Sequence, residues 1–139
     1  MWRTEHTHES SVAPEAVFAL WGDVEGWPSW DASLVATTLD GPFVAGTTGT
    51  LHPLGMPEPI AFTLTAVEDG AGFADETRLG PLVLRFDHRV EPRPGGSRIV
   101  VSIEADGPDA EQIGPAVAED LPESVAALAA AAMRAEQPA

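Results

Sequence analysis

The sequence contains no cysteine, tyrosine, lysine or asparagine in its 139 residues. Without cysteine the chain cannot form a disulfide, a thiolate zinc site or a cysteine nucleophile. Without lysine and tyrosine it has neither a Schiff-base amine nor a phenolic acid. Any catalytic group must therefore come from His, Asp, Glu, Arg, Ser or Thr.

Basic residues are scarce as well. The chain has 7 Lys and Arg against 22 Asp and Glu, which gives a formal net charge of −15. Such a surface repels phosphate groups, so we expect no nucleic-acid partner. The hydrophobic fraction of 44% and the charged fraction of 21% are nevertheless typical of a folded protein. The length indicates one domain, covering residues 1–139.

Long hydrophobic runs are absent. The longest, Val125 to Met133, is rich in Ala and falls short of the roughly 20 residues needed to cross a bilayer, so we expect no membrane insertion. Met1 to Ser11 lacks the cationic start and apolar core of a signal peptide. We therefore expect a cytoplasmic location, and the residue usage is typical of a GC-rich bacterial genome.

The polarity pattern predicts an α+β protein. Trp2 to Val12 alternates with period two, as in a strand with one solvated face, and Pro14 to Gly22 has the spacing of a short helix. Asp23 to Asp31 is expected to form a turn with one or two helical turns. Six further strand-length segments are separated by turn residues: Leu34 to Leu39, Thr47 to His52, Ile60 to Glu68, Phe73 to Leu79, Leu82 to Glu91 and Arg98 to Ala105. Together they predict an antiparallel meander of about seven strands.

Asp109 to Glu136 is expected to form one long C-terminal helix. Its apolar stripe consists of Ile113, Val117, Leu121, Val125, Leu128 and Ala132. Pro115 fits near the helix start, whereas Pro122 is expected to kink its middle.

Several short motifs resemble the START-like (SRPBCC) superfamily, and in particular its polyketide cyclase/dehydrase and lipid-transport branch. They are Val12-Ala13-Pro14, Val17-Phe18, Asp23, Pro28-x-Trp30, Gly46-Thr47-Thr48-Gly49, Leu84-x-Phe86-x-His88-x-Val90-x-Pro92 and Gly95-Gly96-Ser97-Arg98. The resemblance implies a helix-grip fold, in which a seven-stranded antiparallel curved sheet, two short helices and a long C-terminal helix enclose a cavity. Members include cyclases, hydrophobic-ligand carriers, sensors, chaperone cofactors and ribosome-association toxins, so the fold alone does not select a function.

His88 is the most informative residue of the sequence. Strict alternation along Leu82 to Glu91 places it on the apolar face, toward the cavity. Pairing across Gly80-Pro81 sets Phe73 opposite His88 and Asp75 opposite Phe86. Asp75 and His88 then become diagonal neighbours with backbones about 7 to 8 Å apart.

A carboxylate beside an imidazole favours the charged histidine, whereas burial opposes it, so the sequence does not fix the direction of the pKa shift. We consider three roles for His88: an acid or base working with Asp75, a hydrogen-bonding anchor for a ligand, or a structural wall residue.

The rest of the expected cavity wall is mostly apolar. With His88, the predicted ligand-binding residues are Trp30, Phe62, Leu64, Phe73, Leu84, Phe86, Val101, Val117, Leu121, Val125 and His8. Trp27 is expected to be a partly exposed lid residue and His52 an exposed residue at the cavity mouth. His6 and His8 supply two nitrogens with no clear third ligand, so we expect no metal and no cofactor.

The sequence therefore predicts a protein that binds a polyketide-like, polycyclic or acyl molecule between sheet and C-terminal helix. Its sharper version is a cofactor-free cyclase or dehydratase that uses His88. The alternative is a non-catalytic carrier or sensor, and a third hypothesis is an interaction module with a collapsed cavity. A monomer and a homodimer are both compatible with the sequence.

Overall fold

A computed structural model describes residues 1–136. In chain order its elements are β1 (Trp2–Ser10), α1 (Pro14–Gly22), the 3-10 helix η1 (Val24–Ser29), β2 (Leu34–Leu39), β3 (Thr48–Pro53), β4 (Ile60–Glu68), β5 (Gly72–Leu79), β6 (Leu82–Arg93), β7 (Gly96–Asp106), α2 (Ala110–Ala118) and α3 (Leu121–Glu136). Every predicted strand is present. The first strand ends at Ser10, and Val12 is buried in the connection that precedes α1.

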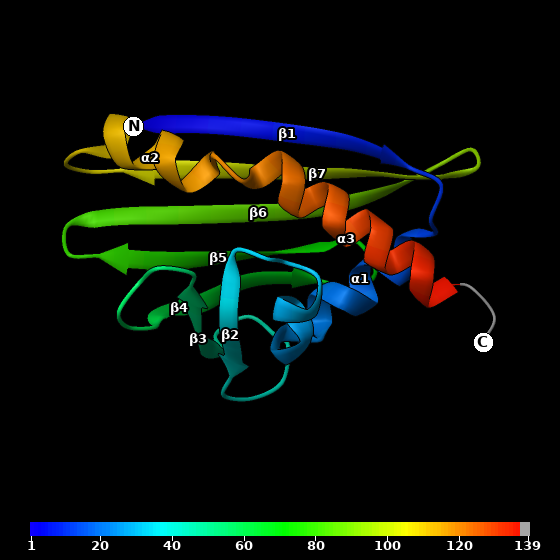
Figure 1. Cartoon of the computed structure of the whole chain (residues 1–139), viewed down its shortest axis with the longest axis horizontal. Helices are drawn as coiled ribbons and strands as arrows, with labels where there is room; N and C mark the ends of the chain where they lie inside the picture. Colours follow the sequence, from blue (N-terminus) through cyan, green and yellow to red (C-terminus); the bar gives the residue numbers. More distant parts are fainter. Residues whose placement is uncertain (137–139) are drawn as a thin grey trace.

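The strands form one antiparallel sheet in the order β1-β7-β6-β5-β4-β3-β2. Strands β2 to β7 are sequential neighbours, and β1 pairs with β7, with His6 opposite Val101 and His8 opposite Ile99. Helices α2 and α3 run along one face of the sheet, and α1 lies beside the C-terminal part of α3 (Figure 1). This is the predicted helix-grip architecture.

The predicted register between β5 and β6 is confirmed. Phe73 pairs with His88 and Asp75 pairs with Phe86. Because side chains alternate across a sheet, this register places Phe73, Asp75 and His88 on the face that the helices cover.

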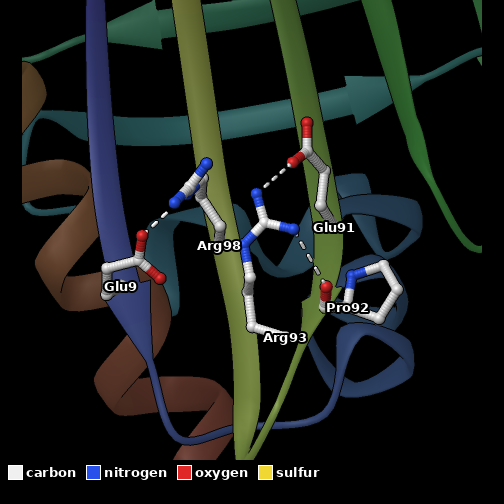
Figure 2. Close-up of polar contacts among 5 residues, drawn as sticks. All are labelled: Glu9, Glu91, Pro92, Arg93 and Arg98. Atoms are coloured by element: carbon white, nitrogen blue, oxygen red, sulfur yellow. Dashed lines mark hydrogen bonds and ion pairs between the residues drawn. The ribbon is translucent and has the colours of Figure 1, made fainter.

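The opposite face of the sheet carries ion pairs between neighbouring strands and within single strands. Arg98 of β7 contacts Glu9 of β1, with its Nε 2.7 Å from the carboxylate, whereas Arg93 contacts Glu91 of the same strand, β6, at 2.9 Å. Figure 2 shows these side chains on the side of the sheet away from the helices. Opposite charges on facing strands stabilise their pairing, and this pattern accounts for the charged alternate positions of the sequence.

The C-terminal segment differs from the prediction of one kinked helix. It is broken into α2 and α3 at Glu119 and Asp120, just before Pro122. Pro122 lacks the N–H that would continue the hydrogen-bond ladder, so it is accommodated in the first turn of a new helix. Pro115 lies inside α2, later than expected.

Three contacts attach these helices to the rest of the chain. The Trp2 indole of β1 packs so closely on Gly114 of α2 that a Cβ there would overlap it. At the start of α3, the Ser124 hydroxyl donates to an Asp31 carboxylate oxygen at 2.8 Å. At its end, Glu136 accepts a hydrogen bond from the Ala13 backbone N–H at 2.9 Å.

An aromatic cluster lies within the core between sheet and helices. Trp27 stacks on Phe62 with ring centroids 6.0 Å apart, and its indole N–H donates to the Trp21 carbonyl. Trp27 is only 7% exposed, so the prediction of a partly exposed lid is wrong. The large ring gains more by burial in the core than it would gain at the surface, and the Trp21 carbonyl satisfies its one polar group.

Candidate ligand-binding site

His88 lies at the centre of an aromatic cluster on β6. Its ring stacks on Phe73, with centroids 4.0 Å and planes 4° apart, and it meets the edge of Trp21 at 5.6 Å. The His88 Nδ1 is 3.3 Å from the Phe73 carbonyl oxygen. Because a carbonyl only accepts, Nδ1 carries the proton, and Nε2 of the neutral ring is left as an acceptor.

Burial lowers the pKa of His88 to about 4, and the hydrogen bond to the Phe73 carbonyl opposes that shift only in part. The ring is therefore neutral at pH 7. This answers the question that the sequence left open, because the desolvation of the imidazolium outweighs every interaction that would favour it.

Asp75 is the second polar group on this face. It lies on β5 between Leu64 of β4 and Phe86 of β6, and its exposed fraction is 6%. Within residues 1–136 its carboxyl has neither a hydrogen-bond nor an ion-pair partner, and burial raises its pKa to about 8. Most Asp75 side chains are thus protonated at pH 7 and present an O–H donor.

Asp75 and His88 are diagonal neighbours, as predicted, yet among the described residues no ion pair or hydrogen bond joins them. The His88 Nδ1–H donates its hydrogen bond to the Phe73 carbonyl and not to Asp75. At pH 7 Asp75 is therefore a neutral acid and His88 a neutral base, and the two do not form an ion pair.

The predicted wall residues divide by burial. Phe62, Leu64, Phe73, Leu84, Val101 and Val125 are buried, whereas Trp30, Phe86, Leu121 and His8 are half-buried. Val117 is 36% exposed, so the predicted apolar stripe leaves the interior before the break at Glu119. The buried members pack against one another in two apolar clusters, and their part in ligand binding stays a prediction.

An open groove of about 520 Å³ lies beside the C-terminal end of α1. It is lined by Phe18, Gly22, Phe43, Val44, Ala45, Val67 and Asp69. These residues come from α1, the β2–β3 loop, the end of β4 and the β4–β5 turn. This groove was not predicted from the sequence. The apolar residues Phe43 and Val44, between the turn residues Pro42 and Gly46, could have indicated it, because apolar side chains in a loop are typical of binding surfaces.

Phe43 connects the groove with the interior. Its ring meets Phe73 edge-on at 5.2 Å and Phe18 at 6.0 Å. Since Phe73 stacks on His88 and precedes Asp75 by two residues on the same face, the two polar groups lie behind this aromatic layer.

The other histidines lie elsewhere. His6 and His8 are on the helix-covered side of β1, and the His52 Nε2 donates to the Met56 carbonyl at 2.6 Å within the β3–β4 connection. Over residues 1–136, no three His, Asp or Glu side chains converge as metal ligands. None of the helices in the same range is long and apolar enough to span a bilayer.

The curved sheet, the helices that it grips and the groove at one end define a START-like helix-grip protein. The chain belongs to the polyketide cyclase/dehydrase and lipid transport family, whose sequence profile matches residues 1–135. No curated protein sequence matches it.

Solved structures with this fold are distant in sequence. Protein NE0264 from Nitrosomonas europaea is 12% identical with a TM-score of 0.80, and 96% of each chain is covered. A Thermobifida fusca protein is 21% identical with a TM-score of 0.78, covering 100% of this chain and 98% of its own. Norcoclaurine synthase from Thalictrum, solved with a transition-state analogue, is 10% identical with a TM-score of 0.74, covering 98% and 96%. At these identities the similarity establishes the fold alone. Family and fold together indicate a domain that binds hydrophobic ligands.

Proposed function

We propose that this protein binds an apolar, polyketide-like, polycyclic or acyl molecule that enters at the groove beside α1 and is held by Asp75 and His88. The observation that carries the proposal is Asp75 itself. A buried polar group without a partner costs about 1 to 3 kcal/mol, and such a cost is typical of sites kept for function. A ligand carbonyl that accepts the Asp75 O–H removes this cost.

The two polar groups are complementary in hydrogen bonding. Asp75 in its neutral form donates, and the His88 Nε2 accepts. A ligand that carries a carbonyl and a hydroxyl on an apolar skeleton satisfies both. Phe43 lies on a loop between the groove and these groups, so a turn of its ring opens the path inward.

Binding is tested with N-phenyl-1-naphthylamine, an uncharged apolar dye that fluoresces when it leaves water. Val44 lines the groove and is 50% exposed, whereas Val35 of β2 is 53% exposed and lies outside the groove lining. We expect Val44→Glu to weaken dye binding at least about fivefold, since a charge in the groove must be desolvated. Val35→Glu is the matched control and should leave the dye affinity unchanged. Equal affinity in both variants, or no dye binding to the parent protein, refutes the proposal.

Native mass spectrometry of the freshly purified protein, compared before and after denaturation, identifies a retained ligand. An organic mass that disappears on denaturation supports a carrier or sensor. Repeating the measurement with Asp75→Leu tests the anchor, because this variant keeps the side-chain size and removes the O–H donor. We expect the retained mass to be reduced in Asp75→Leu.

A second candidate function, a cofactor-free cyclase or dehydratase, is favoured by one observation. The pKa of Asp75, raised by burial to about 8, keeps a proton available at neutral pH, as a general acid requires. His88, with its pKa lowered to about 4, is a weak base at the same pH. In this version Asp75 is the acid, rather than His88 as the sequence suggested. Loss of one water from the retained compound during incubation, abolished by Asp75→Asn, distinguishes an enzyme from a carrier.

A further inference from the structure

The lining of the groove carries one charged side chain. Of the seven groove residues six are apolar or glycine, and the seventh is Asp69 in the β4–β5 turn. None is basic. An apolar surface with a single carboxylate at its rim is complementary to an apolar molecule that ends in a positive charge.

No arginine lines the groove, and Arg134, in the last turn of α3, is outside its lining as well. Six of the seven arginines form ion pairs with carboxylates of the sheet strands: Arg3, Arg78, Arg85, Arg89, Arg93 and Arg98. Figure 2 shows two of them on the face away from the helices. None of these six arginines is part of the groove lining.

Asp69 is the one carboxylate of the lining, and no basic side chain accompanies it. An anionic ligand would have to approach this carboxylate without a cation in the lining to balance it. A cationic ligand gains from the same field, and its ammonium group can also lie near the rings of Phe18 and Phe43.

We propose that the groove selects an aromatic or polycyclic amine, with the protonated amine at Asp69 and the apolar body on Phe18, Phe43 and Val67. This inference rests on the proposed binding function and specifies the charge of its ligand. It separates fatty acids and other carboxylates, which the groove disfavours, from amines of the same shape.

Three probes of one skeleton test the inference: 1-naphthylmethylamine, 1-naphthylmethanol and 1-naphthoic acid, which are cationic, neutral and anionic at pH 7. Their affinities are measured by isothermal titration calorimetry. We expect the amine to bind about tenfold more tightly than the acid, with the alcohol between them, since an ion pair close to solvent contributes about fivefold. Raising NaCl from about 20 mM to about 500 mM should reduce the difference in affinity between the amine and the acid.

Asp69→Asn tests the residue. The amide has the same size and suits the same turn, so the fold should be kept. We expect about a fivefold weaker amine affinity in this variant and an unchanged alcohol affinity. Glu111→Gln removes one exposed charge from α2, at the other end of the sheet from α1 (Figure 1), and should leave both affinities as they are.

The possible results separate the inference from the proposed function. If the acid binds as tightly as the amine, or Glu111→Gln weakens the amine as much as Asp69→Asn does, the amine selectivity is wrong while ligand binding stands. If none of the three probes binds, the proposed function itself is refuted.

Discussion

The imidazole of His88 lies flat on the ring of Phe73, with centroids 4.0 Å apart, and donates its Nδ1 proton to the backbone carbonyl of the same residue. One neighbour on the paired strand thus supplies both the apolar surface and the hydrogen bond. Burial keeps the ring neutral, and the hydrogen bond fixes one tautomer and one orientation. Because the folded and the unfolded chain differ in the protonation of His88, the free energy of unfolding depends on pH.

His88→Phe should make the protein more resistant to acid. The pKa of His88 is about 4 in the fold against an ordinary 6.5, so between these values the unfolded chain takes up a proton that the folded chain does not. The parent protein therefore loses stability as pH falls from 6.5 to 4. We expect the variant, which keeps the aromatic stack, to gain about 3 kcal/mol over the parent at pH 4 and little at pH 7.

Urea unfolding followed by tryptophan fluorescence at several pH values measures this difference. The carboxylates common to both proteins cancel in the comparison. A stability difference that does not change between pH 7 and pH 4 would show that the imidazole is accessible to protons in the folded state.

Asp75→Asn should stabilise the protein at the alkaline end of the pH range. The pKa of Asp75 is raised from 3.8 to about 8, so the folded chain holds a proton that the unfolded chain releases between these values. The parent loses stability as pH rises through this window. The variant does not ionise, so its stability relative to the parent should rise by about 1.4 kcal/mol per pH unit within this window, and by about 5 kcal/mol in all by pH 8.

The matched control is Asp87→Asn, on the outer face of β6 beside Arg89. Removal of this exposed ion pair should change stability by less than about 1 kcal/mol, with no trend from pH 5 to 8. Chemical unfolding at pH 5, 6.5 and 8 measures both variants. The prediction for Asp75 fails if its advantage over the parent does not grow with pH.

Ser97→Ala should stabilise the protein. The Ser97 hydroxyl is fully buried on β7 and has no hydrogen-bond partner among the described residues. Its removal relieves the desolvation of one polar group, so we expect a gain of about 1 kcal/mol in the free energy of unfolding. Ser102→Ala on the same strand is the control, since Ser102 is half-buried and should change stability little. A thermal melt that shows Ser97→Ala below the parent would point to a water or backbone partner for the hydroxyl.

Much of the fold follows from local rules in the sequence. The alternation of β6 and the Gly80-Pro81 turn fix the register that places Phe73 opposite His88, because a shift by one residue would turn the apolar face toward water. Proline chemistry also predicts an interruption near Pro122. Whether that interruption is a kink or a complete break depends on how α2 packs on Trp2, which no local pattern specifies.

The candidate site was predictable only in part. Strand alternation and composition were enough to predict that His88 and Asp75 share a face, that the wall around them is apolar, and that no lysine, cysteine or tyrosine assists them. Tertiary structure decided their protonation, since a pKa depends on burial and on which backbone carbonyl lies within reach. It also decided the groove, because Phe18, Phe43 and Asp69 are far apart in the sequence and meet only in the folded protein.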